Sequence, residues 1–339
     1  MEQTDFLSAL SEAKRKRKTE AILQRLAQPT EPTQPAKLYH YTNADGLVGI
    51  ISTDTLWASH IRHLNDFSEV KYGATLALDV LSSAPDPSGK ELAEFFRRVL
   101  QAVARLIDPS GSPAQMADAG LGRLPFWEAY VVCFCEQNDL LSQWRAYGAN
   151  EGYSIEFDPQ LSFDEGLSSE LDERSISFSQ IDYDKDSQRK RLCALLNDFE
   201  SDLAAASEKV PPASAENAVE AATWFLLDTL SEWVFTVKDG AFQEEREWRL
   251  LCLPPFAKLF DLDADVPRGV KTRVFRRRVV PYVEIGLFRK GRLRSLPITQ
   301  IQCGPCVFPD LSANGVRILL RNNGYKWVAV ESSKIPLRE

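Results

Sequence analysis

Histidine is scarce in this chain of 339 residues, which contains only His40, His60 and His63. A Ser-His-Asp triad therefore has few general bases to draw on. The sequence also contains no G-x-G-x-x-G loop and no Walker motif, so the two commonest glycine-rich phosphate cradles are excluded. No apolar run approaches the roughly 20 residues that a membrane-spanning helix requires, and we expect no membrane partner.

Basic residues are fewer than acidic ones: the chain has 40 Lys and Arg and 48 Asp and Glu, which gives a net charge of -8. This balance argues against a uniformly basic surface for nucleic acid. At the amino terminus the basic residues follow the apolar ones, which is the reverse of a secretory signal. The six scattered cysteines are typical of buried thiols in a reducing compartment. We therefore expect a cytoplasmic protein.

The amino-terminal part is expected to be separate from the main domain. Residues 4–28 have a helical pattern, and the proline-containing segment up to residue 36 predicts an extended linker. One α+β domain would then occupy residues 37–339, with a helical insertion at about residues 187–236. The basic run Lys14–Lys18 is a candidate contact for a polyanion, and its alternative interpretation is a solvated helix face.

Helices and strands are mixed along the chain without strict βαβ alternation, which favours an α+β fold over a doubly wound one. Apolar runs and alternating patterns predict strands at residues 38–42, 56–59, 130–135, 151–159, 245–253, 271–288, 298–303 and 327–330. Helical periodicity and capping residues predict further helices from residue 43 or 45 to 53, and over residues 64–81, 91–107, 142–147, 187–236 with a break at 211–212, and 310–322.

The tetrapeptide C-G-P-C at residues 303–306 matches the redox motif of thioredoxin. That chemistry places the first cysteine at a helix amino terminus, where the dipole lowers the thiol pKa. Here the next helix is expected only near Asp310, so a Gly-Pro turn after a strand is the preferred interpretation. His60 and His63 could join the two cysteines in a zinc site by their spacing. Nothing in the sequence indicates that the pairs converge, and we expect no metal.

Three polar-aromatic clusters remain, at residues 39–42, 142–147 and 244–249. In the third, Glu245 and Glu247 would project to the same side of an extended backbone. An imidazole can bond a ribose hydroxyl, and an aromatic face can stack on nicotinamide. One carboxylate can stabilise an oxocarbenium-like transition state, and a second can deprotonate an acceptor. Together the clusters match the needs of an NAD-cleaving transferase.

Four motifs carry a resemblance to a large bacterial family of domains of unknown function, number 2971. The resemblance covers roughly residues 37–325, with the motifs in the same order along the chain. They are LYHYTNADGLVGIISTDTLWAS followed by LNDFSE, then VVCFCEQNDLLSQWRAYGANEGYSIEFD, then EEREWRLL, and then ITQIQCGP.

The first motif also resembles the opening of ADP-ribosyltransferase-like folds, including DNA-targeting toxins of that class, where a His-x-Thr strand leads into a helix. The resemblance implies a mixed or antiparallel sheet core with helical insertions and an N-terminal helix. It implies that NAD is bound as a substrate by His40, Tyr41 and Thr42, with His40 holding a ribose. Glu247 would be the catalytic glutamate and Glu245 the glutamate on the acceptor side.

The same resemblance implies an aromatic residue against the nicotinamide, for which Tyr147 and Trp144 are the candidates by their order along the chain. Arg145 would reach a phosphate. Because Glu244 precedes the Glu-x-Glu pair, the sequence leaves open which of the three glutamates is central. Each residue also has a structural interpretation: Trp144 as a core aromatic, His40 as a satisfied core histidine, and Arg145 in an ion pair with Glu247.

The function implied is that of an NAD-dependent mono-ADP-ribosyltransferase-like enzyme. It would cleave the nicotinamide glycosidic bond and transfer ADP-ribose to an unknown protein or nucleic-acid acceptor, in a toxin or phage-defence setting. One alternative is a non-catalytic module that binds a nucleotide or nucleic acid, with Lys14–Lys18 and Arg276–Arg278 as polyanion contacts. Another alternative is an NAD glycohydrolase, whose only product besides nicotinamide would be free ADP-ribose.

Overall fold

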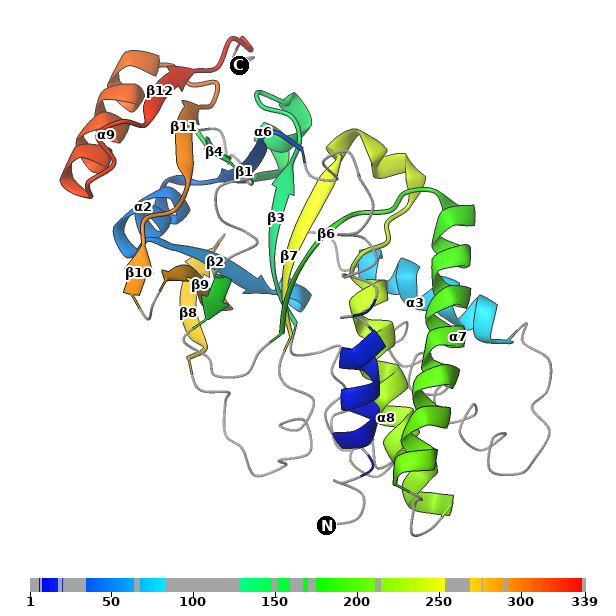
Figure 1. Ribbon diagram of the computed structural model, residues 1–339. Coiled ribbons are helices and arrows are strands. Elements are labelled where there is room, and N and C mark those ends of the chain that lie inside the picture. The colour runs from blue at the N-terminus through cyan, green and yellow to red at the C-terminus, as the bar shows by residue number, and fades with distance from the viewer. Residues whose placement is uncertain are drawn as a thin grey trace.

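The computed structural model describes residues 6, 8–17, 20, 35–63, 68–82, 129–147, 151–158, 167–169, 175–210, 215–253, 269–275, 277–289 and 292–336. Over these ranges the fold is α+β, with a largely antiparallel sheet and a layer of long helices beside it (Figure 1). The helix predicted at residues 91–107 lies outside the described residues.

Twelve strands join into one sheet in this part of the chain. They are β1 (Leu38–Thr42), β2 (Thr55–His60), β3 (Tyr130–Cys135), β4 (Tyr153–Phe157), β5 (Leu167–Ser169), β6 (Ser175–Gln180), β7 (Glu247–Leu253), β8 (Lys271–Phe275), β9 (Arg278–Arg289), β10 (Arg292–Arg294), β11 (Ile298–Cys303) and β12 (Ala329–Ser332). The pairings between these strands are antiparallel except for β11 with β12, which is parallel.

The labelled helices are α2 (Ala44–Thr53), α3 (Ser68–Ser82), α6 (Leu141–Tyr147), α7 (Lys185–Lys209), α8 (Ala215–Val234) and α9 (Pro309–Asn322), with 3-10 helices η1 (Ile61–His63) and η4 (Gly240–Glu245). In Figure 1, α2 and α9 lie on the left and α3, α7 and α8 on the right, with α6 at the top between them. None of the described helices is long and apolar enough to cross a membrane.

Three predicted strands are confirmed to the residue, at 38–42, 130–135 and 298–303, and the strand predicted at 151–159 is observed as the shorter β4. Asn43 caps α2 by accepting a hydrogen bond from the Gly46 amide at 2.9 Å, which settles the choice between residues 43 and 45. The predicted last strand was placed too early, since β12 begins at Ala329. Strands β5, β6 and β10 were not predicted; β6 is a Ser-rich strand in which only Ile176 and Phe178 are apolar.

The sheet forks at β3. One edge of β3 pairs along its whole length with β7. The other edge is shared: its first residues, Tyr130 and Val131, pair with β2, whereas Cys135 at its end pairs with β1. Beyond the fork, β1 continues into β4, β11 and β12, and β2 continues into β9 with β8 and β10. The stretch of β3 between the two branches therefore has an edge without a neighbouring strand.

Strands β3 and β7 are buried on both faces, and for β3 the continuous apolar run predicted this. Val131 and Leu251 pack with the helical layer of α3, α7 and α8. Val132 and Leu250, one residue along, pack with the residues of β1, β4, β11, α2 and α9. The sheet thus lies between two apolar clusters, and its period of two sends alternate side chains to each.

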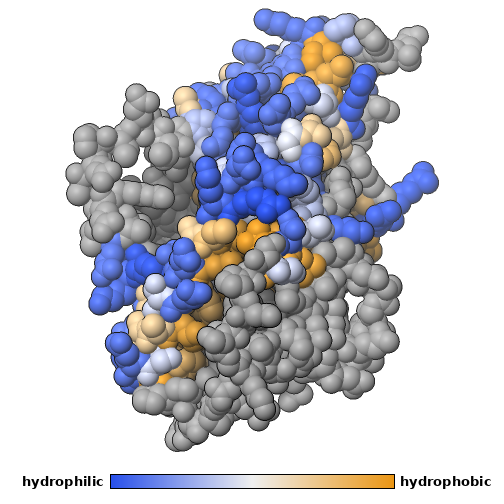
Figure 2. Space-filling view, turned by 90° about the vertical axis from the view of Figure 1, so that its right-hand side faces the viewer, coloured by the Kyte–Doolittle hydropathy of each residue, from blue (hydrophilic) through white to orange (hydrophobic). Residues whose placement is uncertain are grey.

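The N-terminal helix packs onto the helical layer. Residues 8–17 are helical, and Leu10 is fully buried in the same apolar cluster as α7 and α8. Lys14 Nζ donates to Thr229 Oγ1 at 3.1 Å, and Arg17 forms ion pairs with Asp198 and Asp202. Lys14 and Arg17, which belong to the predicted polyanion contact, therefore bind side chains of α7 and α8. Figure 2 shows this helical side of the molecule, where apolar patches emerge below a mainly hydrophilic upper half.

Gly304 is required where β11 leaves the sheet. Its amide donates to the Gly152 carbonyl at 2.8 Å. A Cβ at this position would lie 2.9 Å from the Gly152 oxygen and 3.0 Å from the Trp144 ring. We expect Gly304→Ala to cost about 1–3 kcal/mol in the free energy of unfolding, measured by urea denaturation.

Gly315→Ala is the matched control, because Gly315 lies within α9 and an added Cβ meets nothing within 4 Å. Alanine there should raise the free energy of unfolding by about 0.5–1 kcal/mol through helix propensity. Equal effects of the two substitutions would contradict the packing argument.

Candidate functional site

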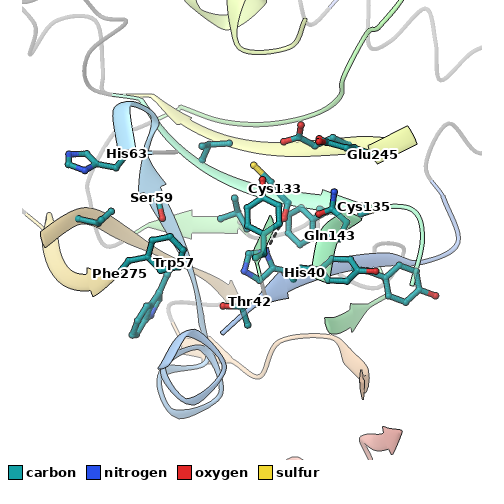
Figure 3. A pocket seen from close by; sticks show the side chains of 18 of the residues that line it. His40, Thr42, Trp57, Ser59, His63, Cys133, Cys135, Gln143, Glu245 and Phe275 are labelled. Carbon is teal, nitrogen blue, oxygen red and sulfur yellow. Dashed lines mark hydrogen bonds between the residues drawn. The ribbon is translucent and has the colours of Figure 1, made fainter. Parts of the chain in front are cut away.

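A pocket opens at the fork of the sheet, with an empty volume of about 830 Å³ that includes space open to solvent. It is lined by β1, β2, β3, β8, α6 and the junction of η4 with β7 (Figure 3). Six of the eight predicted site residues line it: His40, Tyr41, Thr42, Tyr147, Glu245 and Glu247.

The His40 side chain lies against the stretch of β3 whose edge has no neighbouring strand. Its Nδ1 lies 2.8 Å from the Cys133 carbonyl oxygen, and the dashed line in Figure 3 marks this contact. A carbonyl can only accept, so Nδ1 carries the proton and Nε2 is left as an acceptor. Burial lowers the pKa of His40 to about 4, against the opposing Cys133 hydrogen bond, and Arg273 lowers it further. The imidazole is therefore neutral at physiological pH.

Tyr41 and Thr42 line the pocket but are held by the protein. The Tyr41 hydroxyl donates to the Gln137 carbonyl at 2.8 Å and accepts from the Leu140 amide at 3.0 Å. Thr42 is buried, and its Oγ1 occupies the space next to Gly46 of α2. Tyr41 thus fixes the segment between β3 and α6, Thr42 packs against the start of α2, and both also form part of the wall.

Trp144 and Arg145 do not line the pocket. Trp144 is buried edge-on against Tyr41, with ring centroids 4.8 Å apart, and its indole N–H donates to Asp139 at 2.9 Å. Arg145 is exposed. The alternative ion pair between Arg145 and Glu247 is wrong, because Glu247 pairs with other cations. Of the two aromatic candidates on α6, only Tyr147 reaches the cavity.

A network of five charged side chains forms the floor of the pocket beneath Glu247. Lys238 Nζ lies 2.7 Å from Glu69, 2.6 Å from Glu245 and 3.2 Å from Glu247. Arg249 Nε donates to Glu247 Oε1 at 2.7 Å and Nη2 to Oε2 at 2.9 Å, and Arg249 also pairs with Glu69. Three carboxylates thus face two cations, which leaves one excess negative charge next to the cavity.

The network shifts the two candidate catalytic carboxylates in opposite directions. Burial raises the pKa of Glu247, but the charges of Arg249 and Lys238 outweigh burial and lower the pKa to about 2. Burial raises the pKa of Glu245, and Lys238 only partly opposes it. Carboxylates whose environments separate their pKa values are typical of acid–base pairs in active sites.

Glu245 and Glu247 meet through a backbone geometry that differs from the predicted one. An extended segment was expected, but Glu245 is the last residue of η4 and Glu247 the first of β7. Arg246 between them is left-handed, with φ of 41°. The strand alternation argument is therefore wrong here, and the two carboxylates converge because both contact Lys238. Glu244 is exposed on η4 and does not line the pocket.

Two further groups beside Glu247 are uncharged. Burial raises the pKa of the Cys133 thiol, and Glu247 adds to the shift. Burial also raises the pKa of Tyr147, with Cys133 and Glu247 contributing. Gln143, one turn before Tyr147, is buried at the cavity wall. An uncharged thiol and an uncharged phenol therefore lie beside Glu247.

Sequence reasoning missed the wall formed by β2 and β8, which includes Trp57, Ser59, Arg273 and Phe275. The alternation in TLWASH pointed to Trp57 and Ser59 on one face, since Leu56 and Ala58 are fully buried on the other. Lys238 was also missed, although a lysine after the apolar stretch of α8 was a signal. Nothing in the sequence placed β8 next to this cavity.

The C-G-P-C segment lies elsewhere. It is a turn between β11 and α9, as predicted, and burial raises the pKa of both Cys303 and Cys306. His60 is on β2 and pairs with Tyr130 of β3, whereas Cys303 is on β11 and pairs with Tyr153 of β4. No three His, Cys, Asp or Glu of the described residues form a group suited to a metal.

Comparison with family models gives one finding. Residues 143–250 match the model described as "Protein of unknown function (DUF2971)". The chain is similar to this family over those residues. Comparisons with curated proteins and with solved structures found no match. The matched segment contains Gln143, Tyr147, Glu245 and Glu247, whereas His40 and the β2–β8 wall lie outside it.

The opposite pKa shifts predict opposite pH dependences of stability. The stability contributed by Glu247 is present above its unfolded pKa, about 4.3, and is lost as pH falls through about 2. Glu247→Gln should therefore cost about 3–5 kcal/mol at pH 7, because Arg249 loses the carboxylate that accepts from its Nε and Nη2, and less at pH 3.

Glu245→Gln is the matched variant two residues away. The raised pKa of Glu245 means that its ionisation costs stability at neutral pH. The glutamine variant should thus be at least as stable as the wild type at pH 7, with no gain below pH of about 4. Urea denaturation of both variants between pH 3 and pH 8 tests this. If the free energies of unfolding of the two variants change with pH in parallel, the pKa shifts are contradicted.

Proposed function

We propose that the pocket binds NAD and cleaves its nicotinamide glycosidic bond, in an ADP-ribosyltransferase-like enzyme that transfers ADP-ribose to a protein or nucleic-acid acceptor. One observation carries the proposal. Glu245 and Glu247, with pKa values shifted in opposite directions, line the same cavity as the neutral His40 and as Tyr147. The largely antiparallel sheet agrees with the mixed or antiparallel core that the resemblance implies.

Glu247 supplies the negative charge in this proposal. Its low pKa keeps it ionised, and Arg249 holds both of its oxygens in place. Oε2 already accepts from both Arg249 Nη2 and Lys238 Nζ, so Oε1, which accepts from Arg249 Nε, is the oxygen that can accept from a ribose hydroxyl. As the C1′–N bond breaks, nicotinamide leaves with the bonding electrons and positive charge grows on the sugar. A fixed carboxylate at that point stabilises the transition state.

Glu245 takes the proton. It is the more accessible carboxylate, with 24% of its side chain exposed against 8% for Glu247. Its raised pKa brings it closer to the range in which a general base works at neutral pH. When the acceptor attacks C1′, its proton passes to Glu245.

His40 and Tyr147 hold the substrate. With Nδ1 committed to Cys133, His40 Nε2 accepts a hydrogen bond from a ribose hydroxyl. Tyr147 offers a ring close to Glu247, where an electron-poor nicotinamide would stack. In this arrangement Tyr41 and Thr42 shape the wall, and Trp144 supports Tyr41 from behind.

Nicotinamide release from NAD tests the proposal. Glu247→Gln should lower the rate at least about 100-fold, since it removes the charge that stabilises the transition state. Glu244→Gln removes a carboxylate three positions earlier that lies outside the cavity, and should react like the wild type. If the wild type releases no nicotinamide with any protein or nucleic-acid acceptor, and NAD leaves its melting temperature unchanged, the proposal fails.

The products separate the alternatives. Transfer gives an acceptor that has gained the mass of ADP-ribose, whereas a glycohydrolase gives free ADP-ribose only. A binding module would retain NAD or nucleic acid without turnover and would do so equally well after Glu247→Gln. Salt-dependent nucleic-acid binding that survives this substitution would favour the binding module.

A further inference from the structure

The wall of the pocket opposite the carboxylates contains a cation that has no carboxylate partner. In Figure 3, Ser59, Trp57 and Phe275 lie on one side of His40, and Glu245 lies on the other. Arg273 belongs to the first side, since its Nη2 donates to Ser59 Oγ at 2.8 Å. In the described part of the chain no carboxylate forms an ion pair with Arg273.

Aromatic rings surround the Arg273 guanidinium. Its Cζ lies 5.5 Å from the centroid of Trp57, 5.6 Å from Phe275 and 5.9 Å from Tyr282. Its Nε is buried without a hydrogen-bond partner. Arg273 is opposite Val280, and Ser59 is opposite Tyr282, which is two residues from Val280 on β9. These residues therefore lie on one face of the neighbouring strands β8, β9 and β2.

The two cations on the other wall are paired differently. Lys238 contacts three carboxylates and Arg249 contacts two. Arg273 instead contacts one hydroxyl group and three aromatic rings, and each cation–π contact supplies only about 0.5–2 kcal/mol. Taking a guanidinium out of water costs several kcal/mol unless an anion accompanies it. The missing partner of Arg273 is thus an anion that enters the pocket.

We propose that the Arg273 wall is an anion subsite that takes the diphosphate of a nucleotide ligand. Guanidinium pairs with phosphate through parallel N–H···O bonds, and stacking on rings orients it for this role. Ser59 adds a hydroxyl beside it. The nucleotide identity of the ligand rests on the proposed function, whereas the anion subsite rests on Arg273 alone.

The subsite also gives the ligand a direction. The cavity has a cation on one wall and an excess of carboxylates on the other, with the neutral His40 between them. NAD has a negative diphosphate at one end of its ribose and a positive nicotinamide ring at the other. Its diphosphate would lie at Arg273, its ribose at His40 and its nicotinamide ring at Glu247 and Tyr147.

Calorimetric titration with inorganic pyrophosphate and with ADP-ribose tests the subsite. Arg273→Gln should weaken the binding of both probes about tenfold or more, the loss of at least one charge-assisted contact. Nicotinamide riboside, which has no phosphate, should bind Arg273→Gln within about twofold of the wild type. Arg321→Gln removes an exposed arginine of α9 that does not line the pocket, so it is the matched control and should bind all three probes as the wild type does.

A crystal structure of the wild type with pyrophosphate keeps the test independent of variants that fail to fold. Pyrophosphate against the Arg273 guanidinium supports the subsite, and pyrophosphate elsewhere overturns it. Equal affinity of Arg273→Gln and wild type, or a wild type that binds neither anionic probe, also overturns it. Glu247→Gln should retain pyrophosphate binding, so a protein that binds pyrophosphate at Arg273 without cleaving NAD keeps the subsite and loses the proposed function.

Discussion

The buried network of Glu69, Lys238, Glu245, Glu247 and Arg249 is the constraint on which the rest of this molecule depends. It joins α3, the segment after α8, η4 and β7, so the helical layer and the sheet meet through charges as well as through apolar side chains. Buried ion pairs seldom stabilise more than an apolar replacement would, but removing one member is costly. The network therefore defines how the layers are placed, and its excess negative charge lies where the cavity is.

The pocket combines this network with a backbone irregularity. A strand edge without a neighbour would leave a carbonyl of β3 unsatisfied, and His40 supplies the donor. The same hydrogen bond fixes the tautomer of the imidazole. One contact thus satisfies the fork of the sheet and orients a ring nitrogen toward any ligand between β1 and β2. Structural and functional interpretations of His40 are compatible for this reason.

The sequence predicted the buried strands well, because β1, β3, β4 and β11 have clear apolar or alternating patterns at their full length. It also pointed to His40, Tyr147, Glu245 and Glu247, which meet in one cavity. It could not separate Tyr147 from Trp144, since only the packing of α6 decides which ring faces inward. The sequence could not identify Arg273 and Lys238 as site residues. Their place in the site depends on which strands and helices become neighbours, and these pairings join residues far apart in the chain.

The fork has a mechanical consequence. The half of the sheet that begins with β1 is joined to β3 through one residue pair, and the half that begins with β2 through two. Few backbone hydrogen bonds therefore hold either half to β3, and the apolar cluster to which both halves contribute supplies the rest of the connection. A ligand held by Arg273 on one half and by His40 on the other would add a polar connection between the halves at the point where the strands do not pair.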